Sequence, residues 1–226
     1  MTRTTYLVDD DAAVRNAMRG LLDLQPDQTL LDFGSGEAFL DVAGEVDPGV
    51  LLLDLNMPRL GGMEVLQALR AFPGKFAVLV LTGMGTVPRA LDAMRDGVFD
   101  FLEKPCPVEQ LLDTVDAAHA DLALKREAIA GADKAKAQID TLSGRERDVL
   151  MGLLDGLANK NIAFALDISA RTVEIYRANL MHKLQVRSLP AVMRIAFAAG
   201  MAPGGQTPRT EDLSGIMTGR DRLAPI

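Results

Sequence analysis

The sequence predicts two folded parts, an α/β domain built on a five-stranded, doubly wound parallel sheet and a smaller all-α domain of four helices. Over residues 1–120, five short apolar runs alternate with amphipathic helical stretches, and beyond residue 120 the helical pattern continues without strands. The runs are apolar at consecutive positions, which is typical of strands covered on both faces of a parallel sheet. Five successive strand–helix units therefore predict helices on both sides of such a sheet.

The elements of the α/β domain alternate regularly along the chain. The predicted strands are rich in Val and Leu and lie near residues 4–9, 29–33, 50–54, 77–82 and 98–102. The predicted helices follow them near residues 12–24, 36–44, 61–70, 86–95 and 107–120. Glycines such as Gly61, Gly62 and Gly83 stand at the joins, where turns are expected.

The all-α part starts with a clear helix signal. Ser143 and Glu146 form an S-x-x-E capping box, in which each side chain satisfies a backbone N–H of the first turn. Three further helices are expected near 159–166, 170–184 and 188–198. Apolar residues of the last helix fit either a dimer face or the core of the domain, and both interpretations stay open: Leu189, Val192, Ile195 and Ala196.

These patterns divide the chain into four segments. An Ala-rich, polar stretch separates the two folded parts and is interpreted as a helical linker. The last stretch is poor in large apolar residues and rich in Gly, Pro and Thr, which predicts disorder. The predicted segments are the α/β domain 1–120, the linker 121–140, the helical domain 141–201 and the tail 202–226.

Composition limits the class of protein. No uninterrupted apolar stretch approaches the roughly 18 residues that a membrane-spanning helix needs, and no signal-peptide pattern precedes the first charges. Cys106 is the single cysteine, which excludes an internal disulfide framework and fits a reducing compartment. We therefore expect a cytoplasmic protein with no membrane partner.

The net charge of −7 is unevenly distributed. Residues 1–120 carry 19 acidic and 9 basic side chains, whereas residues 141–201 carry 5 acidic and 8 basic ones. An acidic domain followed by a mildly basic one favours different partners, metal cations for the first and a polyanion for the second.

Four of the apolar runs end in residues suited to phosphoryl chemistry. Asp9 and Asp10 follow the first run, Asp54 ends the third, Thr82 the fourth, and Lys104 follows the fifth. Ligands of open α/β sheets bind at the carboxyl edge of the strands, so these side chains are expected in one pocket. Several carboxylates, a hydroxyl and an ammonium suit Mg²⁺ together with a phosphoryl group. An aspartate that attacks phosphorus forms an aspartyl phosphate.

The motifs VDDD, LLLDLNMP, VLTGMG and DFLEKP resemble those of the receiver domain of two-component response regulators, a flavodoxin-like fold. The resemblance implies that Asp54 accepts a phosphoryl group from a sensor histidine kinase. It also implies that Mg²⁺ is held by Asp9, Asp10, Asp54 and the backbone carbonyl of Asn56.

The same resemblance assigns the remaining receiver residues. Thr82 matches the switch hydroxyl, Lys104 the phosphoryl-binding lysine and Phe101 the switch aromatic residue. Met84 and Cys106 depart from the pattern of the subfamily, which often carries His and Phe at these positions.

The helical part contains a helix-turn-helix. NKNIAFALDISARTVEIYRANLMHKL reads as two helices joined at LDIS, the second of which would enter the major groove of double-stranded DNA. Together with LSGRERDVL, this segment resembles the DNA-binding domain of the NarL/FixJ and LuxR-type regulators, and the whole chain resembles the FixJ branch. Tyr176 stands where that family commonly carries a histidine.

The second helix and its edges supply the predicted DNA contacts. Glu174, Ile175 and Ala178 are expected to read bases, because their carboxylate and apolar groups fit cytosine and thymine edges, and Arg177 is expected to contact guanine or a phosphate. The other candidates lie where phosphates would run or on the exposed face: Lys160, Arg171, Thr172, His182 and Lys183.

These observations predict a transcription factor that is not an enzyme. Phosphorylation of Asp54 would draw in Thr82 and Phe101 and make the face formed by residues 86–103 competent to form a homodimer. A phosphorylation-independent dimeric regulator is the first alternative. An aspartyl-phosphate phosphatase or phosphotransferase is the second, and it is disfavoured because Asn56 stands where one such phosphatase class needs an acid.

Overall fold

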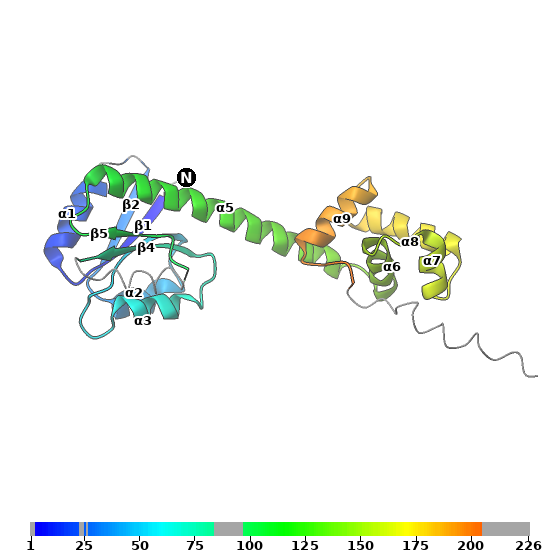
Figure 1. The fold of residues 1–226 in the computed structure, drawn as a ribbon, viewed down its shortest axis with the longest axis horizontal. Helices are drawn as coiled ribbons and strands as arrows, with labels where there is room; N and C mark the ends of the chain where they lie inside the picture. Colours follow the sequence, from blue (N-terminus) through cyan, green and yellow to red (C-terminus); the bar gives the residue numbers. More distant parts are fainter. Residues whose placement is uncertain (1–2, 23–24, 26, 84–96, 205–226) are drawn as a thin grey trace, which may run out of the picture. The chain divides into compact units, whose positions relative to one another are not determined.

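The computed structural model describes residues 3–22, 25, 27–83 and 97–204 (Figure 1). The chain divides into two compact units, Met1–Ile129 and Ala130–Ile226. Three sequence expectations lie outside the described residues: the helix near 86–95, the role of Met84, and the state of the tail from residue 205 onward. No helix in the described part of the chain combines the length and the apolar character needed to cross a bilayer.

The first unit is a five-stranded parallel sheet with the strand order β2-β1-β3-β4-β5. Its strands are β1 (Arg3–Val8), β2 (Gln28–Phe33), β3 (Gly49–Asp54), β4 (Phe76–Thr82) and β5 (Asp100–Glu103). Every residue of β3 is buried, as the unbroken apolar run predicts for a central strand. The predicted α/β class, the five strands and their parallel pairing are confirmed.

Helices cover both faces of this sheet (Figure 1). They are α1 (Ala12–Leu22), α2 (Gly36–Ala43), α3 (Gly62–Leu69) and α5 (Val108–Asp140). The core under α2 and α3 is aromatic, with Tyr6, Phe39 and Phe76 in mutual edge or tilted contact. The core under α1 and α5 is aliphatic and includes Leu111 and Val115. The sheet is thus held between two apolar layers.

Helix α5 runs for 33 residues without a break. The stretch 121–140, predicted as a helical linker, is the C-terminal part of this helix. Its side chains are mostly exposed, but Leu122, Ala135 and Ile139 are buried; Leu122 belongs to the core of the first unit and Ile139 to that of the second. The polar composition of 121–140 therefore marks a solvent-exposed helix rather than the end of one.

The second unit packs α6 (Gly144–Leu154), α7 (Asn159–Ala165), α8 (Ala170–Lys183) and α9 (Leu189–Ala198) around one apolar core. The capping box predicted for Ser143 and Glu146 is present in both directions. On α9, Val192 and Ala196 are completely buried, so these two residues serve the core, whereas Phe197 is exposed.

A buried histidine on α5 makes the stability of the first unit depend on pH. Nε2 of His119 lies 3.0 Å from Oγ1 of Thr5 on β1. The pKa of His119 is lowered from 6.5 to about 4, mainly by burial and in part by the charge of Arg3, with Asp116 partly opposing the shift. As the pH falls, His119 therefore binds a proton near pH 6.5 in the unfolded chain but only near pH 4 in the folded chain.

Stability should fall between these two pH values, by up to about 3 kcal/mol at the acid end. Urea unfolding of the full chain at several pH values, beside the variant His119→Gln, measures this loss as the difference between the two profiles. NMR titration of the His119 ring gives the pKa directly. Two parallel pH profiles, or a ring that titrates at its ordinary value, would contradict the prediction.

Candidate phosphorylation site and nucleic-acid interface

Adjacent parallel strands bring the predicted site residues to one edge of the sheet. Asp9 follows β1, Asp54 ends β3 and Thr82 ends β4, and the registers Val8 with Leu53 and Asp54 with Leu81 align these ends. Asp9, Asp54 and Thr82 are all buried, while Asp10 is exposed. Carboxylate oxygens of Asp9, Asp10 and Asp54 lie within 4.8 Å of one another.

This cluster fits a divalent cation. Three carboxylates, each able to offer one oxygen, are hard ligands, and Mg²⁺ prefers one or two such ligands beside water and phosphoryl oxygens. Nζ of Lys104 lies 2.5 Å from Oδ2 of Asp9 and 3.6 Å from Oδ1 of Asp54. One ammonium thus contacts two of the three carboxylates, which leaves a net negative site that a cation can neutralise.

The electrostatics of Asp54 reflect this crowding. Burial raises the pKa of Asp54, Lys104 opposes the rise, and the nearby Asp9 adds to it. A carboxylate that is disfavoured in its charged form gains from any cation that binds beside it. The site is therefore poised to bind a metal cation.

The backbone around Asp54 allows a close approach of α3. A Cβ atom at Gly62 would lie 2.4 Å from the carbonyl oxygen of Asp54 and 2.8 Å from Cα of Leu55. No side chain fits in this space, so glycine is required where the helix begins next to the strand. Gly62 thus lets α3 begin directly beside the end of β3 that carries Asp54.

The switch candidates also lie at this edge. Thr82 Oγ1 donates to the carbonyl of Gly83 at 3.2 Å, and the Lys104 N–H donates to the carbonyl of Thr82 at 2.7 Å. The Lys104–Pro105 peptide bond is cis. Phe101 is half-buried against the aromatic core, and Asn56 is exposed beside the carboxylates.

One polar contact was missed from the sequence. Arg15 on α1 donates from Nη1 to the carbonyl of Asp9 at 2.7 Å and from Nε to Oδ2 of Asp32 at 3.2 Å. Arg19 also pairs with Asp32. Asp32 lies near the carboxyl end of β2, so the rule that strand ends converge could have drawn attention to it, but no spacing pattern links it to Arg15.

In the second unit, α7 and α8 form the predicted helix-turn-helix. Ser169 caps α8 by accepting from the Thr172 N–H, and Val173 and Leu180 face the core. Thr172 and Arg177 are half-buried. The other predicted contact residues are exposed: Lys160, Arg171, Glu174, Ile175, Ala178, His182 and Lys183.

Several charges on these helices are engaged within the domain. Arg171 pairs with Glu174 at 3.3 Å, and Nη1 of Arg177 donates to Oδ1 of Asn159 at 2.6 Å. Nζ of Lys183 lies 2.7 Å from Oε2 of the buried Glu146. Part of the basic character of this unit therefore stabilises the fold, and less of it is available to a polyanion than the charge count indicates.

Comparison with known proteins identifies both units. The response regulator receiver domain matches residues 6–116, and the bacterial regulatory proteins of the luxR family match residues 140–196. The transcriptional regulatory protein FixJ of Bradyrhizobium diazoefficiens is 43% identical over 198 residues, which cover 87% of this chain and 95% of the relative. The chain is a FixJ-like two-component response regulator. The response regulator protein TmoT of Ectopseudomonas mendocina is 34% identical over 84% of the chain.

Solved structures agree with this family. The response regulator StyR matches with a TM-score of 0.74 at 33% identity and covers 87% of this chain and 99% of its own. Full-length FixJ from B. japonicum matches with a TM-score of 0.55 at 40% identity and covers 88% and 98%. In this FixJ-like regulator the carboxylate cluster falls within the receiver match, and α7 and α8 fall within the luxR-type match.

Proposed function

We propose that this FixJ-like regulator is switched by transfer of a phosphoryl group from a sensor histidine kinase to Asp54. The observation that carries the proposal is the meeting of Asp9, Asp10, Asp54 and Lys104 at one strand edge. A carboxylate oxygen of Asp54 attacks phosphorus, the new O–P bond replaces the N–P bond of phosphohistidine, and the released imidazole nitrogen keeps the electron pair and takes up a proton. Lys104 compensates the charge of the transferred group.

Mg²⁺ would be held by Asp9, Asp10, Asp54 and the backbone carbonyl of Asn56. When bound, this ion supplies the positive charge that the transferring phosphoryl oxygens need. The residues of the chain do the rest: Asp54 presents the nucleophile, and Lys104 offsets part of the negative charge of the carboxylates that it contacts.

The switch would act through Thr82 and Phe101. A phosphoryl group on Asp54 can shift the equilibrium between two receiver conformations only if it makes more favourable contacts in one of them. We infer that these contacts are made by Thr82 and Lys104, and that Phe101 follows Thr82 inward. The face formed by residues 86–103 then forms a homodimer.

The output would be binding of double-stranded DNA by α8. Glu174, Ile175 and Ala178 would read bases, and Arg177 would contact guanine or a phosphate. Phosphate contacts would come from the residues at the edges of the helix, Lys160, Arg171, Thr172 and Lys183, while His182 lies on its exposed face. Because Arg171, Arg177 and Lys183 already have partners within the domain, one copy should bind weakly. In a dimer, binding of one copy would raise the effective concentration of the other at a half-site about one helical turn away. Dimerisation would therefore control the occupancy of the DNA site.

A single set of measurements tests this function. The full chain is incubated with Mg²⁺ and acetyl phosphate, and we measure labelling of Asp54, sedimentation, and footprints on selected DNA. We expect labelling, a monomer-to-dimer shift and a two-half-site footprint that strengthens with phosphorylation. Unchanged DNA affinity after full labelling would support a phosphorylation-independent regulator. Rapid steady-state release of phosphate without a kinase would support the enzyme alternative.

A further inference from the structure

An open hollow of about 720 Å³ lies beside the carboxylate cluster, on the loop that joins β3 to α3. Asp10, Asn56, Arg59 and Glu64 contribute its charged and polar lining. Arg59 is the one cationic side chain among the described residues that line it. A phosphodonor that reaches Asp54 through this hollow passes Arg59.

The backbone holds Arg59 in an unusual conformation. Its φ angle of 67° is in the left-handed region, which a bulky residue other than glycine seldom adopts. The side chain is 78% exposed, and its contact with Glu37 is a long one, 3.9 Å between Nε and Oε1. An exposed pair at this distance restrains the guanidinium weakly. The charge is therefore available to a ligand in the hollow.

The electrostatic problem at this site is the approach of an anion to an acidic domain. Residues 1–120 carry a net excess of ten acidic side chains, and three of the acidic side chains, Asp9, Asp10 and Asp54, form the site itself. Lys104 is already in contact with two of these carboxylates. Mg²⁺ at the site would offset its carboxylates, but the rest of the domain keeps an acidic excess. A dianionic phosphodonor therefore still approaches against a repulsive field, which a cation at the mouth of the hollow reduces.

We propose that Arg59 is a positioning residue for the phosphodonor, whose guanidinium draws the dianionic phosphoryl group into the hollow beside Asp54. This role rests on the proposed phosphorylation of Asp54. A unit charge about 8 Å from a dianion in water changes its local concentration about fivefold. Arg59 would increase the local concentration of the phosphodonor without changing the chemical step. It would therefore lower the KM for the phosphodonor and leave kcat unchanged, and the effect would disappear when salt screens the charges.

The test compares the rate of Asp54 labelling by acetyl phosphate in the full-length wild type, Arg59→Gln and Arg59→Lys, at fixed Mg²⁺. At low ionic strength Arg59→Gln should lower kcat/KM about fivefold through KM, and Arg59→Lys should restore most of it. At about 1 M salt, where the Debye length is about 3 Å, the variants should converge. Phosphoimidazole, a small analogue of phosphohistidine, should show the same pattern, because the phosphoryl group is what both phosphodonors share.

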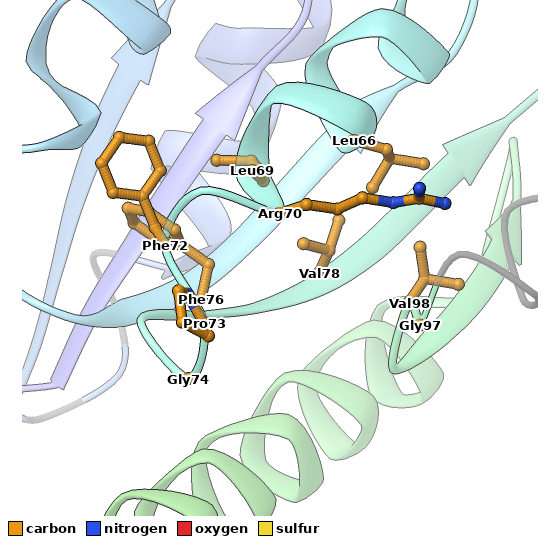
Figure 2. Close-up of a pocket in the computed structure, with 10 residues that line it drawn as sticks. All are labelled: Leu66, Leu69, Arg70, Phe72, Pro73, Gly74, Phe76, Val78, Gly97 and Val98. Atoms are coloured by element: carbon orange, nitrogen blue, oxygen red, sulfur yellow. The ribbon is translucent and has the colours of Figure 1, made fainter.

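A matched control lies at the other end of α3. Figure 2 shows the Arg70 side chain extending over Val78 toward Val98, in a pocket that Arg59 does not line. Arg70→Gln removes the same charge outside the hollow that Arg59 lines, and it should leave the KM nearly unchanged.

Three outcomes would overturn the role of Arg59. They are equal losses in Arg59→Gln and Arg70→Gln, a loss in Arg59→Gln that persists at high salt, and a loss seen with acetyl phosphate alone. Absence of labelling in the wild type would instead refute phosphorylation itself, and the role of Arg59 with it.

Discussion

Replacing Asp54 by Asn should abolish labelling by acetyl phosphate and leave the protein monomeric under conditions that dimerise the wild type. An amide oxygen is a poor nucleophile towards phosphorus, and no other carboxylate in the described region shares the position of Asp54 at the end of the central strand β3. The residual labelling should therefore fall by orders of magnitude rather than by a factor of a few.

The same variant should change the response of stability to Mg²⁺. Burial raises the pKa of Asp54, with Lys104 opposing and Asp9 adding to the shift, so the charged carboxylate is less favourable in the metal-free fold than in the unfolded chain. Asp54→Asn should be at least as stable as the wild type without Mg²⁺. Saturating Mg²⁺ should then stabilise the wild type, by about 2.7 kcal/mol at 100 times the dissociation constant, and the variant far less.

Asp11→Asn is the matched control. This substitution removes one negative charge two residues from Asp9. The Asp11 side chain accepts a hydrogen bond from the Ala13 N–H at the start of α1, and the amide oxygen of an asparagine can accept the same bond. The control should keep labelling, dimerisation and the response to Mg²⁺. Dimerisation of Asp54→Asn at the wild-type level would contradict a phosphorylation-driven switch.

The parts of this site that could be predicted are those set by the topology of a parallel sheet. Asp9, Asp54 and Thr82 follow apolar runs that can only be buried strands, and parallel strands place such ends at one edge. The S-x-x-E pattern at Ser143 and Glu146 likewise reports a local interaction and was confirmed as a capping box. Both kinds of signal depend on spacing along the chain.

The contacts that could not be predicted join residues whose pairing depends on packing angles. The bonds from Arg15 to Asp9 and Asp32 depend on how α1 lies on the sheet. His119 meets Thr5 across 114 positions, because a stripe of α5 covers β1. The left-handed backbone at Arg59 also has no signature in the sequence, since the residue type gives no reason to expect it.

The recognition helix shows the same limit. The sequence places Lys183 among the residues that contact DNA phosphates, because it is basic and lies at the end of α8. In the fold its ammonium is 2.7 Å from Oε2 of Glu146, a residue 37 positions away whose side chain is only 5% exposed. Its contact with DNA stays a prediction, but its contact with Glu146 is in place without DNA.

Lys183→Met should therefore destabilise the helical domain by about 2 kcal/mol. Burial opposes ionisation of Glu146, but the hydrogen bonds from Lys183 and Ser143 outweigh it and hold the pKa of Glu146 below its ordinary value. Removing the lysine leaves a buried carboxylate without its cation, which in enclosed pairs costs about 3–5 kcal/mol. The estimate here is smaller because Lys183 is partly exposed and Ser143 still donates. Chemical unfolding followed by circular dichroism measures the loss.

Two further variants separate the fold from DNA recognition. Lys160→Met removes an exposed lysine from α7 and should leave stability unchanged, while it weakens DNA binding at all sequences and reduces the salt slope by about one. Lys183→Met with Glu146→Gln should recover stability relative to Lys183→Met alone, because the buried charge is gone. If Lys183→Met is as stable as the wild type and loses only DNA affinity, its ammonium serves DNA and the ion pair with Glu146 contributes nothing to the fold.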